Sequence, residues 1–200
     1  MPPAKSRREQ YSEATKAALL EAATRRFAER GFTGTALDDV AADTRVSRGA
    51  VYHHFASKTA LFQAVFDELE AETVRRVAEA AVDAGDPWQA ALAALGAFLD
   101  RCCDPVYGRV VWQEAPLALG WQRWMECEEG YAYGLIEQLV RTIADTGTIA
   151  PLPLEPLVRI TFHALGAAGL ALAEAPAEDK PRVREEYGQV MAHLLTSVRT

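Results

Sequence analysis

Hydrophobic residues recur every three or four positions along most of this chain, which is the spacing of a helix with one buried face. No segment shows a convincing alternation of polar residues with β-branched apolar ones, the pattern of a half-buried strand. A chain of 200 residues is long enough to bury a sizeable core. The pattern therefore predicts an all-α globular protein.

Capping residues mark the helices of the N-terminal part. The first helix is expected to begin near Ser12 and to end at Gly31, because glycine readily adopts the left-handed conformation that closes a helix. Thr35, followed three residues later by Asp38, predicts the start of a second helix of about two turns. Ser47 is expected to cap a third helix in the same way.

Ser57 is expected to cap a fourth helix over residues 58–81. At 1.5 Å per residue this helix would be about 35 Å long, enough to connect two separate bodies. Five further helices are expected, at approximately residues 86–104, 105–116, 117–146, 156–173 and 177–198.

The last two expected helices differ in how their apolar residues are arranged. Residues 156–173 present apolar side chains in nearly every direction, so this helix must be covered on more than one side. Its Gly166 and Gly169 would allow another helix to approach closely. Residues 177–198 are amphipathic. This combination suggests that two copies of the chain pair through these helices.

The weakly polar stretch 154–173 is not expected to span a membrane, because Glu155, Arg159 and His163 interrupt it. Three cysteines cannot form a disulfide framework, and the chain does not open with a secretory leader. A reducing, cytoplasmic setting is therefore expected.

The formal net charge of −7 hides an uneven distribution. Residues 1–62 contain ten Lys/Arg and seven Asp/Glu, a balance of +3, whereas residues 63–200 contain eleven and twenty-one, a balance of −10. The acidity therefore belongs to the second part, and it does not exclude a nucleic-acid partner for the first.

The second and third helices, joined by a short turn, form a helix-turn-helix pattern. Val51 and Phe55 lie four positions apart and are expected to face inward. The outer face would then carry donors for base edges, an aromatic ring and small residues where the backbone approaches DNA, namely Arg48, Gly49, Ala50, Tyr52 and His53. Each polar residue alone would suggest an ordinary solvated face, but their combined spacing favours a major-groove helix.

The segment TALDDVAADTRVSRGAVYHHFASKTAL, residues 35–61, closely resembles the DNA-binding signature of the tetracycline-repressor (TetR) family of bacterial transcriptional regulators. The resemblance extends over residues 12–62 and implies a fold of about nine helices. It places the five outward residues at base-contacting positions, although position 53 is variable in the family. It places three others near phosphates, namely Thr35, His54 and Lys58.

The resemblance also implies how the chain is divided. Residues 1–11 would form a disordered basic arm, residues 12–62 a DNA-binding domain and residues 63–200 a ligand-binding and dimerisation domain. Lys5, Arg7 and Arg8 could reach an adjacent groove, and a merely solubilising tail is an equal alternative. A homodimer would read an inverted-repeat operator with half-sites about 34 Å apart. Repression relieved by a small-molecule effector is the family's usual mode, and no cofactor is implied.

Aromatic residues with a few polar groups among them predict a small-molecule pocket in the second domain. The candidate lining residues are Phe98, Cys102, Trp112, Trp121, Trp124, Met125, Glu128, Phe162 and His163. Glu128 falls on an apolar helix face, where a carboxylate needs a partner. That partner could be a ligand, or it could be one of the arginines Arg101, Arg109 and Arg159. The aromatic residues could equally be ordinary core.

Two other classes of protein remain as alternatives. An enzyme is disfavoured, because the histidines and cysteines lack metal-ligand spacing and no phosphate-binding loop or nucleophile elbow is present. Cys102 and Cys103 could form a thiol sensor, although burial is the simpler interpretation, and the role of Cys127 stays open. A helical interaction module that has lost DNA binding is the third possibility.

Overall fold

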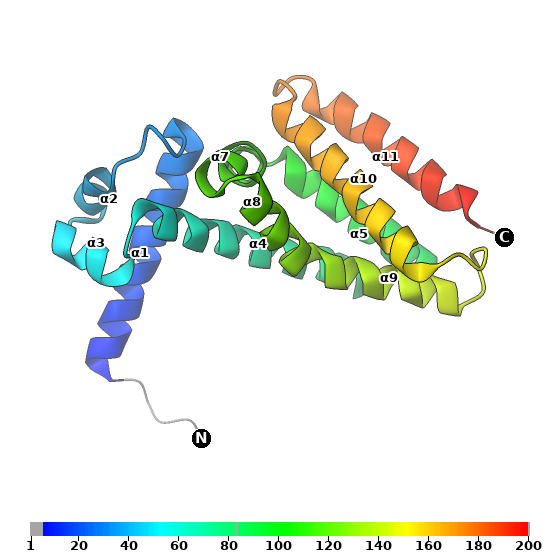
Figure 1. Ribbon diagram of the computed structural model, residues 1–200, viewed down its shortest axis with the longest axis horizontal. Coiled ribbons are helices and arrows are strands. Elements are labelled where there is room, and N and C mark those ends of the chain that lie inside the picture. Colours follow the sequence, from blue (N-terminus) through cyan, green and yellow to red (C-terminus); the bar gives the residue numbers. More distant parts are fainter. Residues whose placement is uncertain (1–5, 83, 200) are drawn as a thin grey trace.

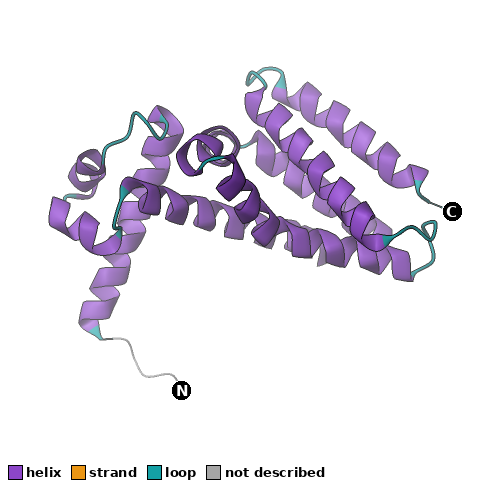
Figure 2. Cartoon of the chain, viewed as in Figure 1, coloured by secondary structure: helices purple, strands orange, loops and turns teal. Residues whose placement is uncertain are grey.

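The computed structural model describes residues 6–82 and 84–199, and most of them lie in helices (Figure 2). In chain order the helices are α1 (Arg7–Arg30), α2 (Leu37–Thr44), α3 (Arg48–His54), α4 (Lys58–Val82), α5 (Pro87–Cys103), α6 (Pro105–Tyr107), α7 (Ala115–Leu119), α8 (Trp121–Glu128), α9 (Gly134–Asp145), α10 (Leu154–Glu174) and α11 (Lys180–Ser197). Two π-helical segments, η1 (Gly108–Glu114) and η2 (Glu129–Tyr133), continue α6 into α7 and α8 into α9. The described residues therefore form nine continuous helical rods, which confirms the all-α prediction.

Helices α1, α2 and α3 form a small body at one end of the molecule, and the start of α4 packs into it (Figure 1). The buried rings of Phe27 on α1 and Phe62 on α4 meet edge to face, with centroids 4.9 Å apart. Phe32 adds a second edge-to-face contact with Phe62 at 5.4 Å. These aromatic contacts fix the first helix against the start of the fourth.

Helix α1 begins at Arg7, five residues before the predicted start. The Ser6 hydroxyl accepts a hydrogen bond from the Glu9 N–H at 3.3 Å, and the Glu9 carboxylate accepts one from the Ser6 N–H at 2.7 Å. This reciprocal capping box satisfies two N–H groups and starts the helix early. The predicted disorder is therefore wrong for residues 7–11, while Lys5 lies outside the described residues.

Helix α4 runs without interruption to Val82, close to the predicted end at residue 81. Its 25 residues correspond to about 37 Å of helix, and it extends from beside α1 along the second part of the molecule (Figure 1). Helix α5 packs along it. The domain boundary predicted at residue 62 therefore falls inside a helix that both parts share.

The helix that starts at Pro105 does not end at Pro116 as predicted, but continues to Leu119. A proline normally breaks a helix because it lacks an N–H and its ring clashes with the carbonyl four residues earlier. Here the preceding turn is widened into η1, in which the Ala115 N–H donates to the Val110 carbonyl five residues back. The chain turns only at Gly120, which has φ 83°.

Helices α10 and α11 lie side by side at the edge of the second part (Figure 1). Helix α10 is long and apolar enough to cross a membrane by length and composition alone, and 33% of its most apolar window is buried within the chain. Ile160 on α10, with Val190 and Leu194 on α11, is exposed. These two helices thus keep apolar surface that the chain itself does not cover.

Candidate DNA-binding surface and internal cavity

The short helix α3 owes its orientation to two buried residues. Val51 and Phe55 are buried one turn apart against the core of the first part. The Ser47 hydroxyl caps the helix by accepting from the Ala50 N–H at 3.2 Å. Four of the predicted base-contacting residues are consequently exposed and a fifth, Ala50, is half-buried; the exposed ones are Arg48, Gly49, Tyr52 and His53.

Arg48 and Tyr52 form a connected polar pair on the exposed face of α3. Arg48 Nη1 lies 3.0 Å from Asp38 Oδ2 on α2, and Arg48 Nη2 donates to the Tyr52 hydroxyl at 3.4 Å. The guanidinium carbon lies 5.5 Å from the centroid of the Tyr52 ring. Because Arg48 and Asp38 are both well exposed, solvent screens their ion pair, which contributes little to stability. Arg48 can therefore exchange Asp38 for an external acceptor at low cost.

The three residues predicted to contact phosphates have different surroundings. His54 is half-buried at the end of α3, and burial, assisted by the neighbouring charges of His53 and Lys16, lowers its pKa. Its ring is therefore neutral at neutral pH in the free protein, with one N–H to donate.

Thr35 and Lys58 are engaged within the protein. Thr35 is only 2% exposed, and its hydroxyl donates to the carbonyl oxygens of Gly31 at 2.9 Å and Arg26 at 3.2 Å. It does not cap α2, whose N-cap is Ala36, so its predicted capping role is wrong, and its contact with phosphate stays a prediction. Lys58 Nζ donates to the carbonyls of Phe32 at 2.9 Å and Thr35 at 3.0 Å. Lys58 thus holds the turn that precedes α2.

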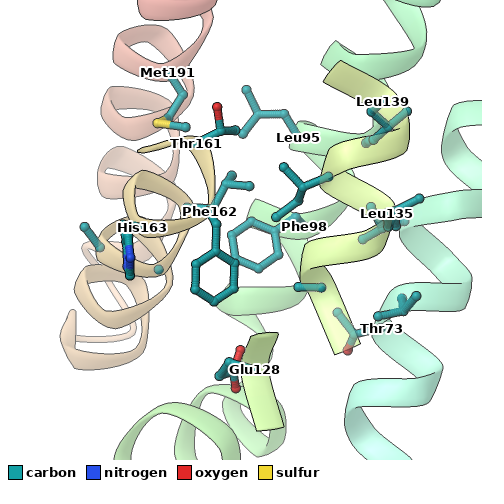
Figure 3. A pocket seen from close by; sticks show the side chains of 18 of the residues that line it. Thr73, Leu95, Phe98, Glu128, Leu135, Leu139, Thr161, Phe162, His163 and Met191 are labelled. Carbon is teal, nitrogen blue, oxygen red and sulfur yellow. The ribbon is translucent and has the colours of Figure 1, made fainter. Parts of the chain in front are cut away.

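A cavity of about 420 Å³ lies in the second part of the molecule, between α4, α5, α8, α9 and α10 (Figure 3). Eight of the nine predicted residues line it, namely Phe98, Trp112, Trp121, Trp124, Met125, Glu128, Phe162 and His163. The ninth, Cys102, is fully buried but is not part of the wall. Burial raises the pKa of the Cys102 thiol well above its usual value, which makes it a poor nucleophile.

Glu128 is 5% exposed at the cavity wall, and its Oε1 has no hydrogen-bond partner among the described residues. The arginines proposed as partners are engaged elsewhere: Arg101 with Asp104, Arg109 with Glu114, and Arg159 with Glu129 and Glu155. Burial raises the pKa of Glu128 well above its usual range, and the nearby Glu70 raises it further, while the Trp124 indole offsets part of the increase. Pairing with an arginine is therefore wrong as an explanation of this carboxyl group.

Glu70 on α4 is a second buried carboxyl group in the same wall, 2% exposed. Its Oε1 accepts a hydrogen bond from the Tyr107 hydroxyl at 2.7 Å. Burial raises the pKa of Glu70 to about 7, against the lowering effects of Tyr107 and the more distant Arg101. Two carboxyl groups with raised pKa values thus share one apolar cavity.

Two family models match this chain. "Bacterial regulatory proteins, tetR family" matches residues 19–65, and "Tetracyclin repressor-like, C-terminal domain" matches residues 88–198, more than half of the sequence. The chain belongs to the TetR family. Because this family consists of transcriptional regulators, the enzyme alternative is set aside.

Relatives resemble the TetR-family chain to different extents. An HTH-type transcriptional repressor of Mycobacterium tuberculosis is 44% identical over 63 residues, 32% of this chain and 34% of that protein. The probable acrEF/envCD operon repressor of Escherichia coli is 37% identical over 78 residues, 38% of this chain and 34% of that protein. The chain thus matches about a third of the length of these relatives. A TetR-family regulator from Pectobacterium atrosepticum matches over 98% of both chains, with 27% identity and a TM-score of 0.83.

Glu114 connects the cavity-bearing part of this TetR-family chain to the turn between α1 and α2. Glu114, at the end of η1, accepts a hydrogen bond from the Phe32 N–H at 2.7 Å and pairs with Arg109 at 2.7 Å. A Cβ atom at Gly31 would lie 2.8 Å from the Glu114 carboxylate, and Gly31 has φ 70°. Glycine at this position therefore allows the close approach as well as the turn.

Sequence reasoning missed Glu70 and Glu114. Glu70 lies within the charged segment DELEAETVRR, which reads as a solvated face. Its spacing from the buried residues Phe66 and Val77, four before and seven after, was the signal that could have placed it on the inner face. Glu114 carries no comparable signal, because its partner lies 82 residues away along the chain.

Proposed function

We propose that this chain is a repressor that binds an inverted-repeat operator as a homodimer and is released by a small molecule held in its cavity. The observation that carries the proposal is the polar outer face of α3, fixed in orientation by buried Val51 and Phe55. An exposed helix that offers an arginine, a tyrosine and small residues on one face suits the major groove.

Arg48 is the sharpest test of DNA recognition. Duplexes that bind the protein would first be enriched from a random library, and affinity would then be measured by fluorescence anisotropy. Arg48→Ala should weaken binding about tenfold to a hundredfold, because a base-contacting arginine contributes roughly 1–3 kcal/mol. Tyr52→Ala should weaken it as well.

Arg123→Ala is the matched control. Arg123 on α8 also forms an exposed ion pair, with Glu126 at 3.5 Å, so its removal should leave DNA affinity unchanged. Failure to enrich any duplex, or equal affinities for the Arg48→Ala and Arg123→Ala proteins, would favour the interaction-module alternative. Lys58 is unsuitable for this test, because its removal would also leave two turn carbonyls without their donor.

The homodimer is supported by the apolar surface that α10 and α11 leave uncovered. A second copy related by two-fold symmetry would bury this surface and present two α3 helices to successive half-sites. The effector is supported by the apolar cavity of about 420 Å³. A neighbour of the same fold, RolR, has been solved with its ligand resorcinol; its identity to this chain is 18% and its TM-score 0.68.

The route between cavity and DNA is supported by η1. Trp112 lines the cavity, and Glu114 two residues later holds the turn after α1 through the Phe32 N–H. A ligand that favours one position of Trp112 would thereby favour one placement of the helix-turn-helix. In the dimer, such a change would alter the spacing of the two recognition helices.

A further inference from the structure

We infer that the effector is an apolar organic amine whose protonated nitrogen binds Glu128 while its hydrocarbon body fills the cavity. The inference rests on the proposed function, since it names the class of small molecule that would relieve repression. It concerns binding itself, however, and can be tested on the free protein.

The charge of the cavity wall is one-sided. Among the described residues that line it, Glu70 and Glu128 are acidic and none is lysine or arginine. The other titratable side chains of this lining are His163 and Tyr107. An anionic ligand would meet two carboxyl groups and no fixed positive charge. The wall therefore selects against acids and favours a cation.

Glu128 supplies the specific acceptor. Its Oε1 is buried and unpartnered, and Glu128 lies at the edge of the cavity, below the rings of Phe98 and Phe162 (Figure 3). A buried polar atom without a partner has a cost in free energy, because it has lost its hydrogen bonds to water. A ligand N–H donated to this oxygen would remove that cost, which gives the donor a place determined by the fold.

A cation would also interact favourably with the pair of buried carboxyl groups, which a neutral donor would not do. Glu70 and Glu128 raise the cost of ionising each other, because both are buried in the same apolar wall. The Tyr107 hydroxyl already donates to Glu70, whereas Glu128 Oε1 has no hydrogen-bond partner among the described residues. An ammonium group would favour ionisation of Glu128 and so form an ion pair as well as complete the hydrogen bond, whereas an alcohol would only complete the bond.

The rest of the wall suits an aromatic or aliphatic body. Phe98 and Phe162 lie above Glu128, and Leu135 and Leu139 continue the wall along α9 (Figure 3). Trp124 also lines the cavity. Aromatic faces near the carboxyl group would add attraction for a cation. The cavity volume of about 420 Å³ lies within the range of drug-sized binding sites.

The test uses three probes with one body and different head groups: 4-phenylbutylamine, 4-phenylbutanol and 4-phenylbutanoate. Binding to the free protein would be followed by quenching of the tryptophans, three of which line the cavity. The amine should bind about tenfold or more tightly than the alcohol, because hydrogen bonds to charged groups are the stronger ones. The carboxylate should bind most weakly.

Glu128→Gln should abolish the preference for the amine and leave affinity for the alcohol nearly unchanged. Glu128→Met, which makes the wall apolar with a side chain of similar length, provides a second variant should the first fold poorly. Glu126→Gln is the matched control, because Glu126 lies on the same helix but its side chain is exposed and paired with Arg123. It should bind all three probes as the unaltered protein does.

Equal binding of the three probes, tighter binding of the alcohol or the carboxylate, no detectable amine binding, or an unchanged amine preference in both Glu128 variants would overturn the inference. DNA release is measured separately, by adding the amine to the complex with an enriched duplex. Amine binding without release would leave the Glu128 site standing and count against the proposed effector control. Release of the DNA by the alcohol but not by the amine would support effector control and count against an amine as the effector.

Discussion

Glu70 shows how strongly one buried side chain can connect pH to stability. Its pKa is raised from 4.5 to about 7, first by burial, so the folded protein holds this proton more tightly than the unfolded chain does. The stabilising contribution is complete below about pH 4.5 and is lost as the pH rises through about 7. The direction is opposite to that of a carboxylate in an ion pair.

Glu70→Gln should therefore flatten the dependence of unfolding free energy on pH within this window. The variant keeps an acceptor for the Tyr107 hydroxyl but cannot ionise. The difference in unfolding free energy between the variant and the unaltered protein should change by on the order of a few kcal/mol between pH 4.5 and 7, since each pKa unit corresponds to about 1.4 kcal/mol. Urea unfolding at several pH values measures it, and parallel curves for the two proteins would contradict the assignment.

At the residue scale, the sequence predicted positions better than roles. Helical spacing placed Tyr52 on the outer face of α3 and Val51 on the inner one, because period alone decides which side of a helix a residue occupies. Thr35 and Lys58 were predicted to meet phosphates, yet their polar atoms are used by the turn before α2. Such contacts depend on the path of the loop, which residue spacing does not specify.

At the element scale, the two glycines of α10 differ in what faces them. A Cβ atom on Gly169 would lie 2.5 Å from the Trp112 ring, whereas at Gly166 nothing lies within 4 Å. The predicted close approach to α10 is therefore made at Gly169, and η1 makes it. Substitution of these two glycines therefore measures how much the close packing of Trp112 on α10 contributes to stability.

Gly169→Ala should destabilise the protein by about 1–3 kcal/mol, because the Trp112 ring must move away from α10 and lose its present packing. Gly166→Ala should be neutral or stabilising by up to about 1 kcal/mol, since alanine favours a helix and meets no neighbour. Thermal and urea unfolding of both variants measure the difference. Equal effects of the two substitutions would mean that Trp112 does not pack against α10 as described.

Helix existence followed from the sequence more readily than helix ends. The start of α5 was predictable because the Asp86 carboxylate caps it in the expected way, accepting from the N–H groups of Trp88 and Gln89. Pro116 misled because a π-helical turn relieves the clash that a proline normally causes. The spacing of apolar residues along the sequence does not reveal such a turn. The continuity of α6, η1 and α7 is therefore seen only in the structure.

At the scale of the whole molecule, the proposed recognition of an operator depends on pairing of two chains. Val190 on α11 is 57% exposed in the single chain, and Val82 at the end of α4 is 80% exposed. Both are surface valines, but only Val190 belongs to the α10 and α11 face proposed to pair. Their comparison separates an interface from ordinary exposed apolar surface.

Val190→Glu should shift the protein toward monomers and weaken operator binding, because a charge would be buried without a partner in the dimer. Val82→Glu should leave the proportion of dimers in solution unchanged. Analytical ultracentrifugation over a range of protein concentrations gives the result directly. A dimer that persists equally in both variants would place the interface elsewhere.

The seven residues of η1 include part of the cavity wall and a contact with the turn between α1 and α2. Trp112 faces the cavity and Glu114 binds the Phe32 N–H. For biosensor engineering, this makes the two sides of the cavity unequal. Libraries that vary Leu139 on α9 or Phe162 on α10 should change which compounds fit while preserving the response, whereas changes at Trp112 should yield binders that no longer switch.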